Sequence, residues 1–308
     1  MRALVTGGCG FIGSNLAVEL AEQGNDVTVL DDMYLGTPEN LAGYRDDIEV
    51  VEGDVRDRTV VADCCTDVDV VFHNAARSSA PMHVDQPVEG ADVNINGFIN
   101  VMEEARANDF SVVYASTSSM YGSVDPPHQE NMGEDPVNLY SASKMSRELY
   151  ATVYADAYGI DVVGLRYFSV YGPREKAKGE YANLVSQWLW KMMEGERPEI
   201  WGDGSRTRDL TFVDDIVRGN IAAAETPVSG EVVNLGTGEE TRLDALVDKL
   251  NHALGTDIDP KFVENPKDNP VMRTKADNSK AKDLLGWEPQ VGIDEGIQRT
   301  VEWYRGGT

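Results

Sequence analysis

The sequence predicts an α/β protein built on a doubly wound parallel sheet. Short apolar runs that suit buried strands alternate with longer segments of helical periodicity. A glycine-rich loop follows the first run, and a pair of aspartates follows the second. The chain has 308 residues, enough for one large domain or two of medium size.

The first strand, loop and helix are expected within residues 2–24. Residues 2–6 form a short apolar run, typical of a strand buried on both faces of a parallel sheet. Residues 7–13 read Gly-Gly-Cys-Gly-Phe-Ile-Gly, and apolar residues then recur at helical spacing over residues 14–23 before Gly24 ends the helix. A glycine motif between a strand and a helix is the context in which this motif binds a dinucleotide.

Three glycines of this loop have separate tasks. Gly7, Gly10 and Gly13 would make the tight turn, admit a pyrophosphate to the backbone and let the helix pack closely on the sheet. The unpaired N–H groups at the start of the helix favour an anion there. We therefore expect Phe11 and Ile12, which lie in the same loop, to contact the cofactor as well.

An acidic pair ends the second expected strand, residues 26–30. Asp31 and Asp32 stand about where a carboxylate holds the ribose 2′-hydroxyl of a dinucleotide. A carboxylate accepts a hydrogen bond from that hydroxyl but repels a 2′-phosphate, and no Arg or Lys follows before Arg45. The sequence therefore favours NAD over NADP.

Three further strands are expected at residues 48–51, 68–73 and 112–115, with a long helix over residues 87–108. The βαβ alternation predicts a parallel sheet with right-handed crossovers. Asp54 and Val55 follow the third strand, at the edge of the sheet where such folds bind ligands. Ala75 and Ala76 follow the fourth, and their small side chains allow a cofactor to approach the backbone closely.

Candidate catalytic side chains follow the fifth strand. Residues 116–119 form a hydroxyl cluster, and Tyr140 and Lys144 begin a helix that extends to about residue 158. Residues four apart share a helix face, so the phenol and the ammonium project together. A nearby ammonium and a positively charged nicotinamide both favour phenolate, which would make Tyr140 a general base. By itself the Tyr-x-x-x-Lys spacing also suits a solvated helix start.

The chain resembles the extended short-chain dehydrogenase/reductase family, and within it the nucleotide-sugar epimerases and dehydratases. The resemblance covers nearly the whole chain. Besides the glycine loop and Tyr140-x-x-x-Lys144, the shared motifs are residues 71–76 (VFHNAA), 94–97 (NING), 165–173 (LRYFSVYGP), 202–209 (GDGSRTRD), 234–238 (NLGTG), 276–281 (ADNSKA) and 284–287 (LLGW).

The resemblance implies roles for individual residues. Thr117 would complete a Thr–Tyr–Lys catalytic set, in which Lys144 orients the nicotinamide ribose and lowers the pKa of Tyr140. The implied cofactor contacts are Asp31 at the adenosine ribose, Asp54 and Val55 at the adenine, and Ala75, Ala76, Asn94, Tyr140, Lys144 and Tyr167 elsewhere. The implied substrate contacts are Ser78, Thr117, Ser118 and Ser169, with Arg208 and Arg273 at the nucleotide diphosphate.

Two departures from the family pattern bear on the substrate. Ser169 stands where the family usually has Asn, which would shorten that contact to the nucleotide sugar or route it through water. Residues 265–270 depart from the usual Arg-Pro-Gly-Asp run and leave the second phosphate contact open.

The reaction implied by the resemblance is NAD-dependent epimerisation of a UDP-sugar at C4, with UDP-glucose and UDP-galactose as the expected pair. Related dehydratases carry Thr-Asp-Glu after the fifth strand and decarboxylases carry a Glu there, whereas this chain has Ser118 and Ser119. The alternatives are a UDP-uronate 4-epimerase, a decarboxylase, a 4,6-dehydratase, a simple NAD-dependent alcohol dehydrogenase and a non-catalytic NAD sensor.

Two domains are expected. Residues 1–172 would form a Rossmann-type NAD-binding domain, to which segments near 211–235 return, and residues 173–308 a smaller nucleotide-sugar-binding domain. The three tryptophans of the second part, Trp188, Trp190 and Trp201, are expected in a core or an interface. The resemblance implies a homodimer formed by the helices at 87–108 and 136–158.

Composition limits the partners and the compartment. The chain has 53 Asp and Glu against 27 Lys and Arg, a formal charge of −26, which repels nucleic acid and anionic membrane. This excess and the shortage of lysine favour a protein from a high-salt cytoplasm, the alternative being an ordinary acidic enzyme. No leader or bilayer-spanning stretch is evident, so a soluble cytoplasmic protein is expected. Cys9, Cys64 and Cys65 have neither disulfide nor metal-ligand spacing, and no metal is expected.

Overall fold

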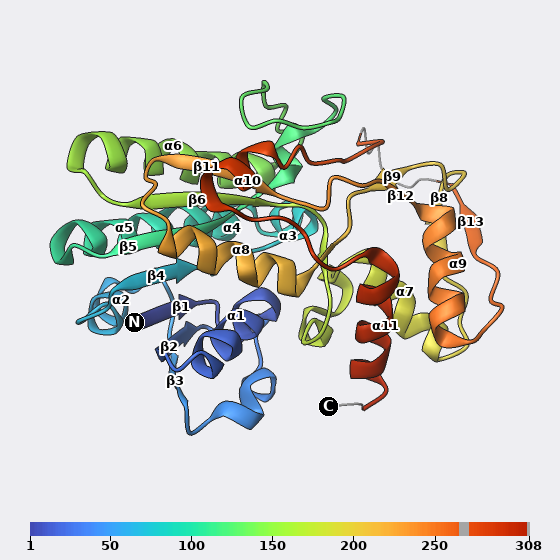
Figure 1. Ribbon diagram of the computed structural model, residues 1–308, viewed down its shortest axis with the longest axis horizontal. Coiled ribbons are helices and arrows are strands. Elements are labelled where there is room, and N and C mark those ends of the chain that lie inside the picture. The colour runs from blue at the N-terminus through green and yellow to red at the C-terminus, as the bar shows by residue number, and fades with distance from the viewer. Residues whose placement is uncertain (265–270, 307–308) are drawn as a thin grey trace.

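Seven parallel strands form the main sheet in a computed structural model that describes residues 1–264 and 271–306 (Figure 1). The order is β11-β6-β5-β4-β1-β2-β3, so the chain reverses its direction across the sheet between β1 and β4. The strands are β1 (Arg2–Thr6), β2 (Asp26–Asp31), β3 (Ile48–Glu52), β4 (Val70–His73), β5 (Ser111–Thr117), β6 (Val162–Tyr167) and β11 (Glu231–Leu235). The expected Rossmann-type sheet is confirmed.

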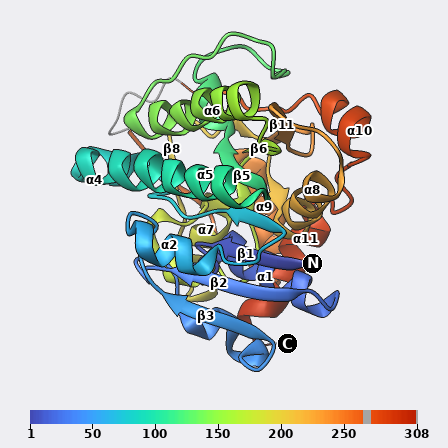
Figure 2. The same ribbon diagram turned by 90° about the vertical axis from the view of Figure 1, so that its left-hand side faces the viewer.

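Helices cover both faces of the sheet (Figures 1 and 2). On one face lie α1 (Phe11–Glu22), α8 (Val213–Glu225) and α10 (Ser279–Leu285). The other face carries α2 (Arg58–Cys64), α3 (Ala80–Asp85), α4 (Pro87–Ala91), the π-helical turn η2 (Asp92–Asn96), α5 (Gly97–Asn108) and α6 (Leu139–Tyr158). An apolar core lies on each side, because the strands are buried on both faces.

Element boundaries shift by a few residues from those expected. Helix α1 begins at Phe11 because Gly10 is its extended N-cap, and β5 continues through the first two hydroxyl residues to Thr117. The long helix at 87–108 is interrupted by the π turn η2, which carries Asn94. A π turn is frequent at functional sites, since it redirects side chains within a helix.

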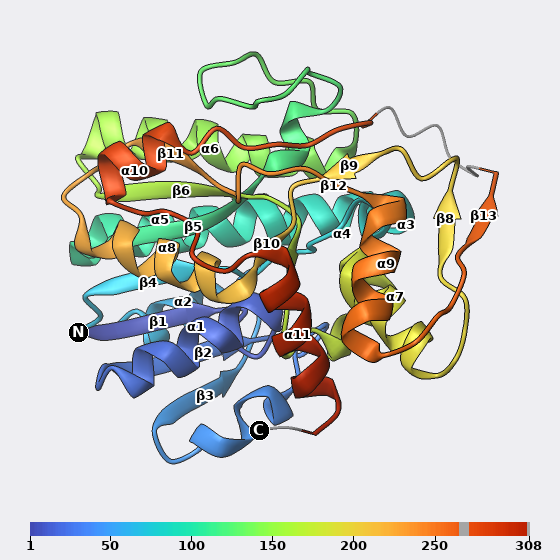
Figure 3. The ribbon, with the colours of Figure 1, turned by 45° about the vertical axis from the view of Figure 1, so that its right-hand side comes forward.

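The second lobe lies at one end of the sheet (Figure 3). It contains α7 (Leu184–Met193), α9 (Leu243–Leu254), α11 (Ile293–Tyr304) and two small pairings, β8 (Glu199–Trp201) with β13 (Lys261–Val263) and β9 (Thr207–Arg208) with β12 (Thr241–Arg242). β7 (Val170–Tyr171) pairs with β10 (Thr211–Phe212) between the lobes. An apolar core that includes Trp188 and Leu246 holds this lobe together.

The chain returns to the sheet twice after entering the second lobe. β11 pairs with β6 as the seventh strand, α8 covers it, and α10 packs beside both. Short 3₁₀ turns lie at η1 (Pro38–Tyr44), η3 (Ser118–Tyr121) and η4 (Lys176–Tyr181). The departure at 265–270 lies outside the described residues. Across the part that is described, no helix combines the length and apolarity needed to cross a membrane.

Candidate active site

A cavity of about 740 Å³ opens at the carboxyl ends of the strands, on the side facing the second lobe. The glycine loop, the ends of β2, β4 and β5, and the first turns of α6 line it, together with Trp201 and Arg208 from the second lobe. Its position beside the reversal between β1 and β4 is the place where doubly wound sheets bind ligands. Its volume lies within the range usual for ligand sites.

The glycine loop is held where a side chain would not fit. Gly7 has φ +69°, and a Cβ built there would lie 2.8 Å from the amide nitrogen of Ala75. A Cβ on Gly13 would lie 2.2 Å from the carbonyl oxygen of Gly7. Helix α1 starts at once without a side-chain cap. The loop therefore leaves a helix N-terminus open to an anion.

Asp31 is built into the loop rather than free in the cavity. One carboxylate oxygen accepts from the backbone N–H of Cys9 at 2.9 Å, and the other from that of Met33 at 2.8 Å. The residue is 5% exposed and still lines the cavity, and burial raises the pKa of its carboxyl group. Each oxygen keeps a second lone pair, so the carboxylate can still accept from a ligand hydroxyl.

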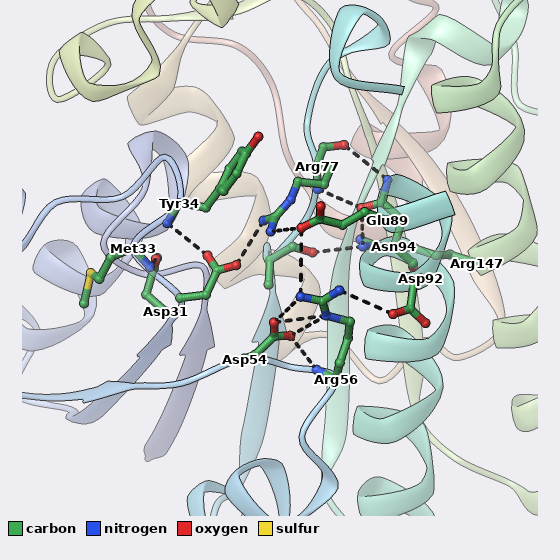
Figure 4. A network of polar contacts seen from close by, with 12 residues as sticks. Asp31, Met33, Tyr34, Asp54, Arg56, Arg77, Glu89, Asp92, Asn94 and Arg147 are labelled. Carbon is green, nitrogen blue, oxygen red and sulfur yellow. Dashed lines mark hydrogen bonds and ion pairs between the residues drawn. The ribbon is translucent and has the colours of Figure 1, made fainter. Parts of the chain in front are cut away.

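The expectation that no basic residue lies near this acidic pair is wrong. Arg77 donates to Asp32 at 3.0 Å. It also donates to Glu89 at 2.9 Å, and its guanidinium stacks on the Tyr34 ring at 3.8 Å (Figure 4). Arg77 is 45 positions from Asp32 in the sequence, and only the return of β4 beside β1 brings the two together.

The cluster around Arg77 remains negatively charged. Arg56 donates to Asp54 at 2.6 Å and to Asp92 at 3.4 Å, and it lies 3.9 Å from Glu89 (Figure 4). Two guanidinium groups thus share four carboxylates, the fourth being Asp32 on Arg77. This arrangement still disfavours a 2′-phosphate.

The three expected catalytic residues meet at the centre of the cavity. Thr117 ends β5, Tyr140 lies in the first turn of α6, and a side-chain hydrogen bond joins them. Asn138 caps the helix by accepting from the N–H of Ser141 at 2.9 Å, which sets the start of α6. Lys144 lies one turn further and donates to the backbone oxygen of Ala115 at 3.0 Å.

Electrostatics at Tyr140 differ in one respect from the expectation. Burial raises the pKa of the phenol, while the hydrogen bond with Thr117 and the positive charge of Arg147 lower it. The ammonium of Lys144 donates to Ala115 and lies 5.9 Å from the centre of the Tyr140 ring, while burial and Arg147 hold the pKa of Lys144 well below its usual value. Arg147, which sequence reasoning missed, is a second cation that favours the phenolate.

Most of the other expected site residues line the cavity. Those that do so are Gly7, Gly10, Phe11, Ile12, Gly13, Asp31, Asp32, Val55, Ala75, Ala76, Ser78, Ser118, Tyr167, Ser169 and Arg208. Three others lie behind it or apart from it. Asp54 belongs to the Arg56 cluster, Asn94 binds the backbone of Arg77 on both sides, and Arg273 pairs with Glu240 at 2.6 Å.

The second lobe supplies a cation and an aromatic ring. The guanidinium of Arg208 donates to the carbonyl oxygens of Thr207 at 2.7 Å and Val271 at 3.2 Å, and burial lowers its pKa to about 10. Trp201 was expected in a core or an interface, yet it is 39% exposed and lines the cavity. No pattern in the sequence separates it from Trp188, because its place at the cavity wall depends on the pairing of β8, which it ends, with β13.

The residues present fit a dinucleotide. The glycine cradle has no room for a Cβ, the helix N-terminus stands open, and a buried carboxylate borders the same cavity. The Thr117–Tyr140–Lys144 group lies further along that cavity. NAD would therefore span from the acidic cluster to Tyr140, with its pyrophosphate at the start of α1.

Known proteins resemble this chain along its whole length. The UDP-glucose 4-epimerase of Mycolicibacterium smegmatis is 38% identical over 311 residues, covering 99% of each chain. The UDP-N-acetyl-alpha-D-glucosaminuronate decarboxylase of Bacillus cytotoxicus is 32% identical and covers 99% of this chain and 98% of its own. The crystal structure of UDP-glucose 4-epimerase from Thermotoga maritima with UDP-glucose has a TM-score of 0.94, 35% identity and 99% coverage of both chains.

The family description that matches residues 3–236 is "NAD dependent epimerase/dehydratase family". The match spans the sheet, the glycine loop, the catalytic group and the return of β11. The chain is an NAD-dependent enzyme that belongs to the NAD dependent epimerase/dehydratase family, and its relatives act on nucleotide sugars.

Proposed function

We propose that this enzyme interconverts UDP-glucose and UDP-galactose by epimerisation at C4. The observation that carries the proposal is the cavity centre, where Thr117, Tyr140 and Lys144 meet and Ser118 and Ser119 stand beside them. Among the described lining residues the carboxylates are Asp31 and Asp32, both at the glycine-loop end. At the catalytic end, the described part of the lining holds no carboxylate to serve as the acid or base of an elimination, which favours epimerisation over dehydration or decarboxylation.

The residues of this chain would share the work as follows. NAD, when bound, supplies reversible oxidation of the sugar carbon. Tyr140 takes the proton of the C4 hydroxyl and later returns it, and Thr117 holds the phenol in place. Lys144 donates to the backbone oxygen of Ala115, and this hydrogen bond holds its ammonium in the wall of the cavity. The 4-keto sugar must turn over between the two proton transfers, and the large cavity leaves space for that rotation.

The second lobe would hold the nucleotide. Arg208 donates to carbonyl oxygens and has no carboxylate partner among the described residues, so its fork can turn to a diphosphate. Trp201 offers an exposed ring to a base. We also propose that Ser169, which lines the cavity with φ +29°, contacts the sugar.

The test is incubation of the NAD-loaded protein with UDP-galactose, read by NMR. UDP-glucose should form without net NADH, and in deuterated water C4 should keep its original hydrogen. Stoichiometric NADH would indicate a dehydrogenase, a 4-keto-6-deoxy product a dehydratase, and deuterium at C4 proton abstraction, and each would refute the proposal. UDP-uronates run in parallel test the alternative raised by the decarboxylase relative.

We propose a homodimer formed through α4, α5 and α6, which lie side by side on one face of the sheet (Figure 2). Val88, Leu149 and Val153 expose apolar side chains there, at 81%, 62% and 57%. Leu149→Glu with Val153→Glu should give monomer mass in light scattering at high salt. Phe262→Glu, on the second lobe, is the matched control and should leave the dimer intact. A monomeric parent protein would exclude the interface.

We propose that the enzyme works in a cytoplasm rich in salt. The charge of −26 repels itself, nucleic acid and anionic membranes, and high ionic strength screens the self-repulsion. Within the described residues, many of the few cations already pair with a carboxylate, as Arg166 does with Glu148 at 2.7 Å, so many surface acids have no cation to pair with.

A further inference from the structure

Arg147 is the largest fully buried side chain of the protein as far as it is described. It lies on α6 three residues after Lys144 and seven after Tyr140, so all three occupy one face of the helix. A buried guanidinium costs several kcal/mol in desolvation unless its donors are used, so its position here calls for a reason.

The guanidinium donates to backbone oxygens from three elements. Nη2 donates to Ala75 after β4 at 2.9 Å, Nη1 to Ala115 of β5 at 3.5 Å, and Nε to Asn94 of the π turn η2. Ala75 and Ala115 belong to the cavity wall, and the oxygen of Ala115 also accepts from Lys144. Arg147 therefore ties together the backbone segments around the catalytic group from behind.

Carboxylates do not neutralise this cation within residues 1–264 and 271–306. Glu148, the next residue of α6, is turned away and pairs with Arg166 at 2.7 Å. The groups that face Arg147 or Tyr140 from neighbouring elements are His73 of β4, His83 of α3 and Tyr114 of β5.

Burial keeps all three of these facing groups neutral near pH 7. It lowers the pKa of both histidines, and it raises the pKa of Tyr114 well above its usual value. Burial also lowers the pKa of Arg147 itself, to about 10, which leaves the guanidinium charged at neutral pH. The phenols of Tyr140 and Tyr114 are the groups whose ionised forms favour the charged guanidinium and raise the pKa of Arg147.

We propose that Arg147 is a positioning residue for catalysis: its buried guanidinium anchors the Ala75 and Ala115 backbone around Lys144 and supplies the fixed positive charge that favours the Tyr140 phenolate. This inference rests on the proposed role of Tyr140 as the general base. Lys144 and Arg147 then have different roles on α6: Lys144 donates hydrogen bonds within the cavity, and Arg147 provides a permanent charge behind the cavity wall.

The expected size of the effect follows from the helix geometry. Seven residues separate Tyr140 and Arg147, which is about 10 Å along the helix axis. At an effective dielectric constant of about 20, a unit charge at that distance shifts a pKa by about one unit. Loss of the charge should therefore reduce the phenolate fraction of Tyr140 about tenfold at a fixed pH below its pKa.

The test compares Arg147→Lys, which keeps the charge, with Arg147→Gln, which keeps hydrogen-bond donors without the charge, and Arg147→Met, which keeps neither. Each variant is prepared as the NAD-loaded protein, and its melting temperature is recorded. The titration of Tyr140 is read as phenolate absorbance against pH, with a Tyr140→Phe version of each variant subtracted. The pH profile of turnover is recorded in parallel.

Arg147→Lys should keep the Tyr140 pKa within a few tenths of a unit while melting at a lower temperature. Arg147→Gln and Arg147→Met should raise it by about one unit and shift the turnover profile equally. An unchanged pKa in a folded neutral variant, or a shift in Arg147→Lys as large as theirs, would overturn the inference. If both neutral variants fail to fold, a shift of about one unit in Arg147→Lys would still overturn the inference, because that variant keeps a cation at the same position. Activity retained by Tyr140→Phe would instead refute the proposed function, since the titration does not depend on the sugar substrate.

Discussion

Asp32→Asn should shift the cofactor preference of this enzyme toward NADP. The Asp32 carboxylate accepts from Arg77 at 3.0 Å, and the Arg77 side chain is only 8% exposed. The substitution removes a charge that repels a 2′-phosphate. It also frees the guanidinium N–H of Arg77 that now donates to the Asp32 carboxylate. We therefore expect the preference for NAD to rest on an ion pair that occupies Arg77, not on the absence of a basic residue.

The magnitude follows from the contacts of Arg77. A hydrogen bond between a guanidinium and a phosphate contributes about 1.5–3 kcal/mol. Glu89 remains 2.9 Å from Arg77 in the variant and keeps part of its charge balanced. A value of about 2 kcal/mol then corresponds to a roughly 30-fold fall in the ratio of the NADP to the NAD dissociation constant.

The assay is calorimetric titration of NAD and NADP into cofactor-free protein at one ionic strength. Asp92→Asn is the matched control, because Asp92 belongs to the same cluster but bonds Arg56 instead of Arg77. In Asp92→Asn the ratio of the NADP to the NAD dissociation constant should stay within about twofold of the parent value. The double variant Asp32→Asn with Arg77→Met should lose the gain, since the cation that would bind the phosphate is gone.

Two results would refute this reasoning. A ratio in Asp32→Asn that changes no more than in Asp92→Asn would show that the ion pair does not govern the choice. An equal gain in the double variant would show that repulsion by Asp32 acts alone and that Arg77 is a bystander.

Three further predictions concern catalysis, acid stability and salt. Tyr140→Phe should lower turnover at least ~10²-fold while leaving NAD binding unchanged, since general acid–base groups contribute that much, and near-full activity would contradict its role. Glu240, whose pKa the Arg273 pair and the Thr207 hydroxyl lower from 4.5 to about 2, stabilises the fold above pH 4.5 and loses that effect as the pH falls toward 2. Glu240→Gln should therefore reduce the free energy of unfolding by about 1 kcal/mol at pH 7, and by progressively less below pH 4.5. Glu239→Gln, at an exposed neighbouring position, is the control and should leave the free energy of unfolding unchanged. A loss of stability in Glu240→Gln that did not depend on pH would be inconsistent with the ion pair. The melting temperature should rise with KCl, because screening relieves the repulsion among surface acids, and a flat curve across the molar range would rule out the high-salt proposal.

The resemblance to the family, and not a local pattern, added Thr117 to the expected catalytic set. The sequence alone predicted the sheet, the glycine loop and the shared helix face of Tyr140 and Lys144. These features are local: an apolar run between glycines makes a buried strand, and a four-residue spacing on a helix places Tyr140 beside Lys144 whatever the rest of the chain does. The return of residues 211–235 to the sheet could also be predicted in part, because this segment repeats the helix-then-strand pattern of the first half.

Only the tertiary structure decided which charges meet. Arg77 and Asp32 lie on different strand ends, and their contact follows from the pairing of β4 with β1, which no local pattern encodes. The helix face of Arg147 could be predicted, since its spacing puts it on the same face as Lys144. Its burial could not, because it depends on β4, β5 and η2 packing around it. Trp201 likewise joins the cavity only because β8 pairs with β13 in the second lobe. Local periodicity therefore predicts elements and faces, whereas the electrostatics of the site depend on contacts between residues far apart in the chain.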